Sequence, residues 1–470
     1  MKEILDYLYN LKKVLIELCK NNNISVKYVL VLGNEACDMD SVISSIFISY
    51  LKNIESNFIK INKKLKKVEF NTQKLDLKIY IPVINCKENH LFNRFDIELL
   101  FNKINLNKEI LIYFENLVFK NINSGIPYLN INENKIKINK DFGIILVDHF
   151  SLSLKQEFLK DYITEIYDHH NDEGFNFSEY KNLKEKHIEY PRCSAINIIL
   201  EEFINKYNNI DEFIDNISTD EKNNFVDMIV CTQIIDSRWE SKDKEIVFKL
   251  IDKLKYSKIL NKNIETYSEN INDKDINLYS NKNKDDISYQ NHKDILENHS
   301  SKSREKVDKM RENDIKDIYE ILKKAKVDED KNLSLSLKDL FKKDMKTYMI
   351  EGKDLTVLFS VIIVKFDKLK TKYSLKNLKD FMSKITKNKS DIVVAFVKTG
   401  EEKGCLFIHS LPEFIKDKEK IKKYEKHLNE KLDKESIGEC YEEEDLFIVK
   451  GSTSRKVIWP IIKQFIQESV

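Results

Sequence analysis

Strand-like and helix-like segments alternate from Val26 to Asp236, and this alternation constrains the fold more than any other feature of the chain. Branched and aromatic residues from Val26 to Leu32 predict a buried strand, and Ser41–Leu51 predicts the helix that follows it. Further strands are predicted at Leu77–Asn85, Gly143–Asp148 and Glu165–Asp168, and further helices at Cys193–Ile204 and Phe225–Asp236. Such alternation is typical of an α/β fold with a doubly wound, mostly parallel sheet.

The composition changes sharply after this region. From about Lys253 to Asp314 the chain is dominated by Asn, Lys, Asp and Ser, and it has too few apolar residues to offset the entropy lost on ordering. Order is predicted to return near Asp317, with strand-like runs at Leu355–Phe366, Asp391–Val397, Cys405–Ser410 and Asp445–Gly451. We therefore predict a larger domain at 1–250, a disordered insertion at 251–316, and a smaller α/β domain at 317–470.

The overall composition excludes several classes of protein. The 79 basic and 78 acidic residues give a formal charge of +1, so charge gives no reason to expect a nucleic-acid partner. The seven dispersed cysteines indicate a reducing, cytoplasmic location and argue against a disulfide framework or a zinc finger. No apolar run approaches the roughly 20 residues that span a bilayer. The first 18 residues predict an amphipathic helix and not a signal peptide.

Acidic and imidazole side chains follow the apolar segments of the larger domain. They are Asp38 and Asp40, then Asp148-His149, then Asp168-His169-His170, and finally Asp236. A single Asp at such a place usually caps a helix, but parallel strands bring their carboxyl ends to one edge, so four clusters in succession would converge. Cations would have to neutralise so many carboxylates, and Asp with His suits Mn²⁺ or Mg²⁺.

Two such ions a few ångströms apart would turn a bridging water into hydroxide at neutral pH. They would also stabilise the charge that develops in an in-line phosphoryl displacement. The residues alone therefore predict a two-metal phosphohydrolase.

Several motifs in the chain resemble those of a known family. The stretches "GNEACDMDS" (Gly33–Ser41), "VDH", "YDHHND" and "IID", in this order, resemble the four metal motifs of the DHH phosphoesterase superfamily. "GSTSRKVIWP" (Gly451–Pro460) resembles the Ser-Arg-Lys signature of the second type of DHH-associated domain, which family II inorganic pyrophosphatases, exopolyphosphatases and Prune proteins share. Lys323–Tyr348 resembles the segment that opens that domain.

The resemblance implies a DHH metal-binding catalytic domain at 1–250 and a DHH-associated, substrate-binding domain at 317–470, with the active site in the cleft between them. One metal would be held by Asn34, Asp38 and Asp148, and the other by Asp40, Asp148, His169 and Asp236. The phosphate would be contacted by Arg94, His170, Lys346, Arg455 and Lys456, of which His170, Arg455 and Lys456, together with Asp148, would be catalytic. Arg and Lys suit phosphate oxygens as a planar fork and a point charge respectively.

Small differences within the family favour one activity. Asn34 stands where pyrophosphatases have a His ligand, and His170 is retained where Prune proteins carry Arg. The resemblance therefore implies an exopolyphosphatase, which removes terminal phosphate from inorganic polyphosphate. The alternatives are an inorganic pyrophosphatase or a Prune-like cyclic-nucleotide phosphodiesterase and, from another class, a non-catalytic interaction protein. The expected partner is inorganic polyphosphate or pyrophosphate, and the expected oligomeric state is a monomer.

Two departures from the family pattern leave alternatives open. Pro191 and Arg192 stand where the family has small residues, so they could alter the approach of phosphate, or Arg192 could add a phosphate contact. Phe150 follows Asp148-His149 where a polar residue is usual, which leaves the surroundings of the metal ligands open. His149 is expected to support a ligand and not to be one.

Overall fold

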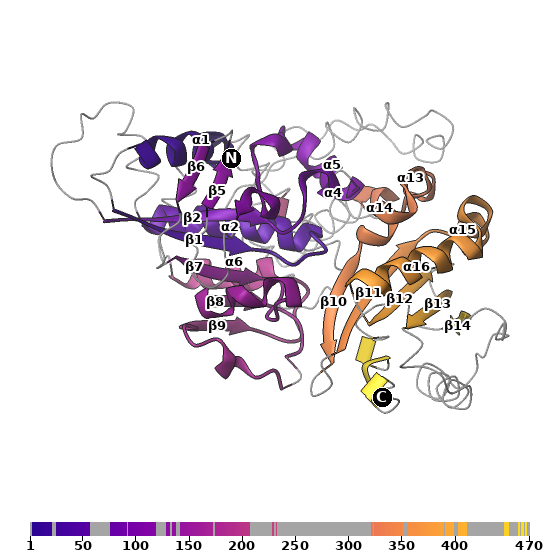
Figure 1. The fold of residues 1–470 in the computed structure, drawn as a ribbon. Coiled ribbons are helices and arrows are strands. Elements are labelled where there is room, and N and C mark those ends of the chain that lie inside the picture. The colour runs from indigo at the N-terminus through magenta and orange to yellow at the C-terminus, as the bar shows by residue number, and fades with distance from the viewer. Residues whose placement is uncertain are drawn as a thin grey trace, which may run out of the picture.

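The computed structural model of this chain describes the parts from which the site is built. These are residues 2–20, 25–56, 76–91, 93–118, 128–131, 134–137, 142–172, 174–206, 228–229, 232, 321–322, 324–350, 355–389, 391–398, 403–410, 446–450, 459–460, 462–464 and 466–467. Two main sheets lie next to each other, the first coloured indigo to magenta and the second orange in Figure 1.

The first sheet has six strands in the order β3-β2-β1-β7-β8-β9, and every pairing among them is parallel. The strands are β1 (Ser25–Leu32), β2 (Asp76–Ile84), β3 (Ile112–Tyr113), β7 (Gly143–Val147), β8 (Ile163–Asp168) and β9 (Glu185–Ile188). The chain builds one half outward from β1 and then returns to build the other half outward from β7. This is a doubly wound α/β sheet, as predicted.

Helices flank this sheet. They are α1 (Lys2–Lys20), α2 (Met39–Glu55), α4 (Glu88–Leu91), α5 (Phe95–Lys103) and α6 (Ala195–Lys206); α2 packs on β1 and β2 and against α6. Single turns of 3-10 helix lie at Lys108–Ile110, Phe114–Asn116 and Phe177–Glu179, with a longer stretch at Leu154–Tyr162. A small antiparallel sheet is formed by β4 (Leu117–Val118), β5 (Tyr128–Ile131) and β6 (Asn134–Lys137).

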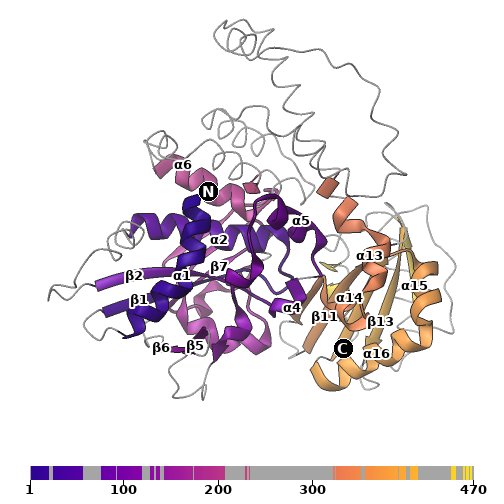
Figure 2. The same ribbon diagram turned by 90° about the horizontal axis from the view of Figure 1, so that it is seen from above.

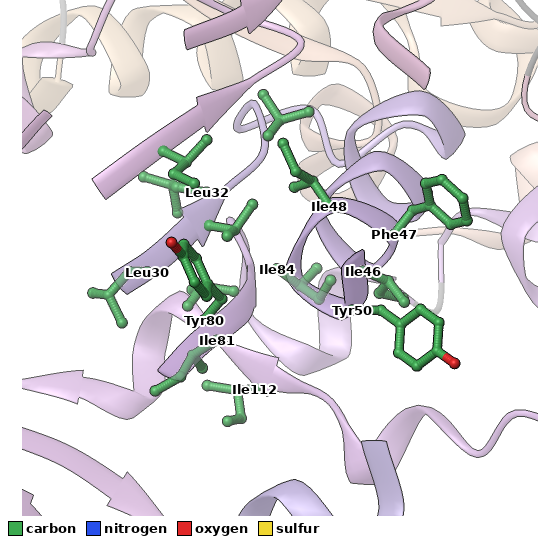
Figure 3. Close-up of a cluster of buried hydrophobic side chains, with 14 of the residues drawn as sticks. Leu30, Leu32, Ile46, Phe47, Ile48, Tyr50, Tyr80, Ile81, Ile84 and Ile112 are labelled. Atoms are coloured by element: carbon green, nitrogen blue, oxygen red, sulfur yellow. The ribbon is translucent and has the colours of Figure 1, made fainter. Parts of the chain in front are cut away.

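The main core lies between α2 and the first two strands. Figure 3 shows α2 beside the strand residues Leu30, Ile81 and Ile84, with Phe47 and Tyr50 on the far side of the helix, and all five side chains are at most 2% exposed. Buried serines of α2 bond within the helix, as Ser45 and Ser49 donate to the carbonyl oxygens four residues earlier at 2.6 and 2.7 Å. Because α2 is buried on nearly all sides, its start, which carries Asp38 and Asp40, is held firmly in place.

The second sheet belongs to the C-terminal part of the chain. Its order is β10-β11-β12-β13-β14, formed by β10 (Met345–Ile350), β11 (Leu355–Ile363), β12 (Ile392–Lys398), β13 (Lys403–Ser410) and β14 (Leu446–Lys450). The β11–β12 pair is parallel and the other pairs are antiparallel. The helices α13 (Glu329–Ser334), α14 (Leu337–Lys342), α15 (Phe366–Tyr373) and α16 (Leu375–Lys389) accompany it. Leu358, Val393, Leu378 and Met382 share its core.

The two parts meet near α5 and α14, which lie close together in Figures 1 and 2. Arg94, next to α5, donates from Nη1 to the carbonyl oxygen of Lys343 at 2.8 Å. The Lys343 ammonium lies 4.4 Å from the centre of the Phe95 ring. Farther along, the Thr347 hydroxyl of β10 donates to Glu35 at 3.4 Å. The second sheet therefore lies against the same edge of the first sheet that carries the loop after β1.

Most of the predicted elements are confirmed. The long apolar strands of both sheets and the helices at Ser41–Leu51 and Cys193–Ile204 all form, whereas β9 and β10 were not predicted. Of Phe225–Asp236, the described residues Met228, Ile229 and Thr232 are helical. The Asn/Lys-rich segment at 251–316 lies outside the described residues, and the division of the chain into these three regions stays a prediction. Within the part of the chain that is described, no helix is both long enough and apolar enough to span a membrane.

Candidate metal centre

The candidate site lies where the strand order of the first sheet reverses. β1 and β7 are neighbours, yet the chain after β1 continues to one side and the chain after β7 to the other. The loop after β1 carries Asn34, Asp38 and Asp40, and Asp148 follows β7 directly. Open α/β sheets bind their ligands at this kind of position, because the two loops diverge there and leave room.

Asp148 lies at the centre of the cluster and is 2% exposed. Its Oδ2 accepts hydrogen bonds from Asn34 Nδ2 at 2.5 Å and from the Ser41 hydroxyl at 2.7 Å. Its Oδ1 lies 3.2 Å from His169 Nε2. One carboxylate therefore contacts groups from both loops that follow β1 and β8, as expected of a ligand shared by two ions.

Asp40 and Asp38 flank the start of α2. The Asp40 carboxylate is 3% exposed and accepts hydrogen bonds from the Ala195 and Ile196 amides at 2.7 and 3.2 Å. These amides begin α6, whose positive end favours a carboxylate. Asp38 caps α2 by accepting from the Ser41 amide at 3.1 Å. Both acids are thus held by helix N-termini, and Asp40 Oδ2 lies 3.7 Å from His169 Nε2.

His169 is oriented by a hydrogen bond from its other nitrogen. Its ring is 1% exposed, and Nδ1 lies 2.9 Å from the carbonyl oxygen of Arg192. A carbonyl oxygen can only accept, so Nδ1 carries the proton, and in the neutral ring Nε2 then has the lone pair. Nε2 is the atom that faces Asp40 and Asp148, so the histidine is prepared for coordination.

Asp168, to which the family resemblance assigns no role, supports both histidines. Its Oδ1 accepts from the amides of His169 and His170 at 2.7 and 3.1 Å and from His170 Nδ1 at 2.7 Å. Together with Asp148 it completes a group of four residues whose ligand atoms lie within 4.8 Å of one another. The sequence signal for this role is the position of Asp168 directly before two histidines, because an aspartate at the end of a strand can accept hydrogen bonds from the backbone amides of the turn that follows.

The electrostatics of the cluster favour a bound cation. Burial raises the pKa of Asp148 well above its usual value, and the charges of Asp38 and Asp40 raise it further. Burial would also raise the pKa of Asp38, but the charges of Lys346 and Arg94 hold it well below its usual range. Crowded, buried carboxylates of this kind are stabilised by a divalent cation, so the residues present fit a metal centre.

Asn34 is within the cluster but presents a donor to it. Its Nδ2 faces Asp148, and its Oδ1 accepts a hydrogen bond from the Ala36 amide at 2.9 Å. Coordination by Asn34 would therefore use Oδ1, which has a second lone pair beside the one that accepts from the Ala36 amide.

The predicted phosphate-contacting residues differ in how they lie. Lys346, on β10, is close enough to influence the charges of Asp38, Asp148 and His170. Arg94 also acts on the charge of Asp38, but its guanidinium is buried and bonded to the Lys343 carbonyl. Burial, with the nearby charges of His169 and Lys346, lowers the pKa of His170 to about 4 despite its bond to Asp168. Asp236, Arg455 and Lys456 lie outside the described residues.

The residues that depart from the family pattern are also resolved. The Arg192 side chain, 3% exposed, lies between two glutamates, with Nη2 2.9 Å from Glu201 and Nη1 3.3 Å from Glu189. Phe150 packs against Phe175, with ring centres 5.1 Å apart. His149 donates from Nδ1 to the carbonyl oxygen of Val147, just before Asp148, at 3.0 Å.

Comparisons with known proteins agree with the motifs. Human exopolyphosphatase PRUNE1 (Homo sapiens) is 26% identical to this chain over 142 residues, which are 30% of the chain and 24% of the human protein. The resemblance to DHH phosphoesterases is confirmed. The matched region therefore spans about a quarter of the length of this relative.

The chain was also compared with protein-family models and with solved structures. No protein-family model matches the chain. Among solved structures, the crystal structure of a "putative family II inorganic pyrophosphatase" from Methanococcus jannaschii superimposes with a TM-score of 0.48 at 14% identity, covering 93% of this chain and 99% of that chain.

Proposed function

We propose that this protein is a metal-dependent exopolyphosphatase that hydrolyses terminal phosphate from inorganic polyphosphate. The observation that carries the proposal is the convergence of Asp40, Asp148 and His169 where the strand order of the sheet reverses. His169 Nε2 lies 3.2 Å from Asp148 Oδ1 and 3.7 Å from Asp40 Oδ2. The name of the human relative, an exopolyphosphatase, supports this choice of substrate.

The proposed cofactors are two Mn²⁺ or Mg²⁺ ions. Asn34, Asp38 and Asp148 would hold one ion, and Asp40, Asp148, His169 and Asp236 the other. When bound, the ions would supply a nucleophile at neutral pH and neutralise charge on the phosphate. Oxygen and imidazole donors without thiolate suit these hard ions.

The surrounding side chains would bind and orient the substrate. Lys346 adds a positive charge beside Asp38 and Asp148, and Arg455 and Lys456 are proposed to contact the terminal phosphate. His170, held by Asp168 at 2.7 Å, would direct its Nε2 toward the scissile phosphate. Because Nδ1 is occupied by the carboxylate, the proton on His170 would be delivered or accepted at Nε2.

The test is Mn²⁺-dependent release of orthophosphate by the purified chain. Long-chain polyphosphate, pyrophosphate and a cyclic nucleotide are compared under one condition, with Asp148→Asn as the control. We expect release from the long chain that disappears in the control. Activity confined to pyrophosphate or to the cyclic nucleotide would move the assignment to the corresponding alternative. No metal-dependent activity on any of the three would favour a non-catalytic protein.

A further inference from the structure

One short segment contacts two of the proposed metal ligands at once. This segment, Glu189–Ile196, joins β9 to the first turn of α6. The carbonyl oxygen of Arg192 accepts from His169 Nδ1 at 2.9 Å, and the Ala195 and Ile196 amides donate to Asp40 at 2.7 and 3.2 Å. The position of the segment therefore sets the orientation of both His169 and Asp40.

The side chain of Arg192 anchors this segment. Its guanidinium is 3% exposed and lies 2.9 Å from Glu201 on α6 and 3.3 Å from Glu189 at the start of the segment. One buried guanidinium thus forms ion pairs with a residue at the start of the segment and with a residue on α6 just beyond its end. Both glutamates are partly exposed, at 26% and 44%, so water could solvate them if the arginine were removed.

We propose that Arg192 is a positioning residue that acts through its own backbone carbonyl to fix His169 for metal coordination; the inference rests on the proposed two-metal function. The guanidinium holds the segment, the segment holds the carbonyl, and the carbonyl fixes the proton on Nδ1 and the lone pair on Nε2. Because the side chain faces two glutamates, its role is to position a metal ligand and not to contact the phosphate. Groups that orient a ligand in this way commonly change metal affinity by 10- to 100-fold.

The first test is Mn²⁺ titration of the full-length protein by calorimetry. Arg192→Gln and Glu201→Gln each remove one side of the anchor. We expect one of the two Mn²⁺-binding steps to weaken by about 10- to 100-fold in both variants. Arg192→Lys keeps the charge but loses the planar fork, so its affinity should fall between those of the wild type and Arg192→Gln.

The chain offers a matched control at the next position. Glu202 also lies on α6 and is half-buried, but it faces His187, with the two side chains 3.8 Å apart. Glu202→Gln removes the same charge from the same helix without touching Arg192. Because Glu202 lies in a separate group of possible ligands with Glu185 and His187, the comparison is made at the Mn²⁺-binding step that Arg192→Gln weakens. At this step the affinity of Glu202→Gln should equal that of the wild type, and an equal loss in both glutamate variants would overturn the proposal.

Kinetics separate this role from a phosphate contact and from a purely structural role. If Arg192 positions the metal ligand, raising the Mn²⁺ concentration restores kcat of Arg192→Gln, and KM for polyphosphate stays unchanged. A KM that remains high at saturating Mn²⁺, with wild-type Mn²⁺ affinity, would show a phosphate contact and overturn the inference. A lower Tm with wild-type Mn²⁺ affinity would reduce Arg192 to a structural role and also overturn it.

Failure of the proposed function is distinguishable from failure of this inference. A wild-type protein that binds no Mn²⁺ or Mg²⁺ in the titration would overturn the two-metal function and the inference with it. Wild-type binding that is unchanged in Arg192→Gln and Glu201→Gln would leave the function standing and reject the positioning role alone.

Discussion

Asp148 has a backbone φ of 61°, in the left-handed region. Among residues with a Cβ, Asp and Asn adopt this conformation most readily. The backbone at this position turns the carboxylate toward Asn34 and Ser41, and the side chain is buried where the charges of Asp38 and Asp40 oppose its ionisation. The local geometry thus accepts an aspartate or an asparagine, and the chemistry requires the aspartate.

Asp148→Asn should accordingly separate folding from function. Asn keeps the left-handed backbone and an oxygen acceptor but removes a charge that burial and two neighbouring acids disfavour. We expect the metal-free variant to be more stable than the metal-free wild type by about 1 kcal/mol, with the Mn²⁺-induced rise in Tm lost. Thermal unfolding with and without Mn²⁺ measures both. A metal-free variant less stable than the wild type would mean that the buried Asp148 carboxylate does not destabilise the metal-free protein.

Some residue roles leave no trace in the sequence. Asp38, Asp40, Asp148 and His169 could be predicted to converge because they follow strands, and the carboxyl ends of parallel strands lie at one edge of the sheet. Arg192 could not be placed, because its link to His169 runs through a backbone carbonyl that every residue possesses. Its side-chain partner Glu201 lies nine positions away on a helix, and nothing in a single sequence pairs the two.

At the scale of elements, the turn from β1 to α2 depends on Gly33. A Cβ at this position would lie 2.8 Å from the Ser41 carbonyl oxygen and 3.0 Å from the Ser41 Cβ. No flexible side chain could move aside, so the start of α2 would have to shift. That start carries Asp38 and Asp40, and the Ser41 hydroxyl that bonds Asp148.

Gly33→Ala should therefore lower the free energy of unfolding by roughly 1–3 kcal/mol and weaken Mn²⁺ binding as well. Gly174→Ala is the control, because that glycine has a φ of 81° with no atom within 4 Å of the added Cβ. Its cost should be conformational alone, about 1 kcal/mol, with unchanged Mn²⁺ affinity. Urea unfolding and Mn²⁺ titration give the two quantities. Wild-type Mn²⁺ affinity in Gly33→Ala would show that α2 can shift without disturbing its acids.

The elements that could be predicted are those that are buried on both faces, because such elements consist of a continuous run of apolar residues. β1, β7 and β11 are apolar along most of their length because both faces are covered. β9, "EKHI", is an edge strand with exposed residues, so its charged pattern looked like a loop. β10, "MKTYMI", mixes polar and apolar residues, and its pairing with β11 comes from the tertiary structure and not from its own pattern.

At the scale of the whole molecule, Lys343 lies where the two main parts meet. Its ammonium contacts Asn332 and the Phe95 ring, and its carbonyl oxygen accepts from Arg94. Burial lowers the pKa of Lys343 to about 8, with Arg94 adding to the effect and Asp96 opposing it. The charged lysine is therefore held at the junction at a cost to stability.

This cost should appear as a dependence of stability on pH. Because the pKa is lower in the folded state than its ordinary value of 10.5, the unfolded chain binds more protons between pH 8 and 10.5. The lysine's destabilising contribution is full below pH 8 and disappears as pH rises through this window, by up to about 3 kcal/mol. Unfolding free energies of wild type and Lys343→Met, measured at several pH values, should differ in slope there. Parallel curves would contradict the prediction.

The strand order has a consequence for synthesis on the ribosome. β1 is one of the two central strands of the six-stranded sheet, bonded to β2 on one edge and to β7 on the other. β7 ends at Val147, so the second edge of β1 cannot pair with β7 until more than a hundred further residues have been synthesised. An unpaired central strand readily pairs with a wrong partner. The pairing of β7 with β1 also brings Asp148 to Ser41, so one step joins the two halves of the sheet and the first two loops of the candidate metal centre, and β8, His169 and α6 are added only later in synthesis.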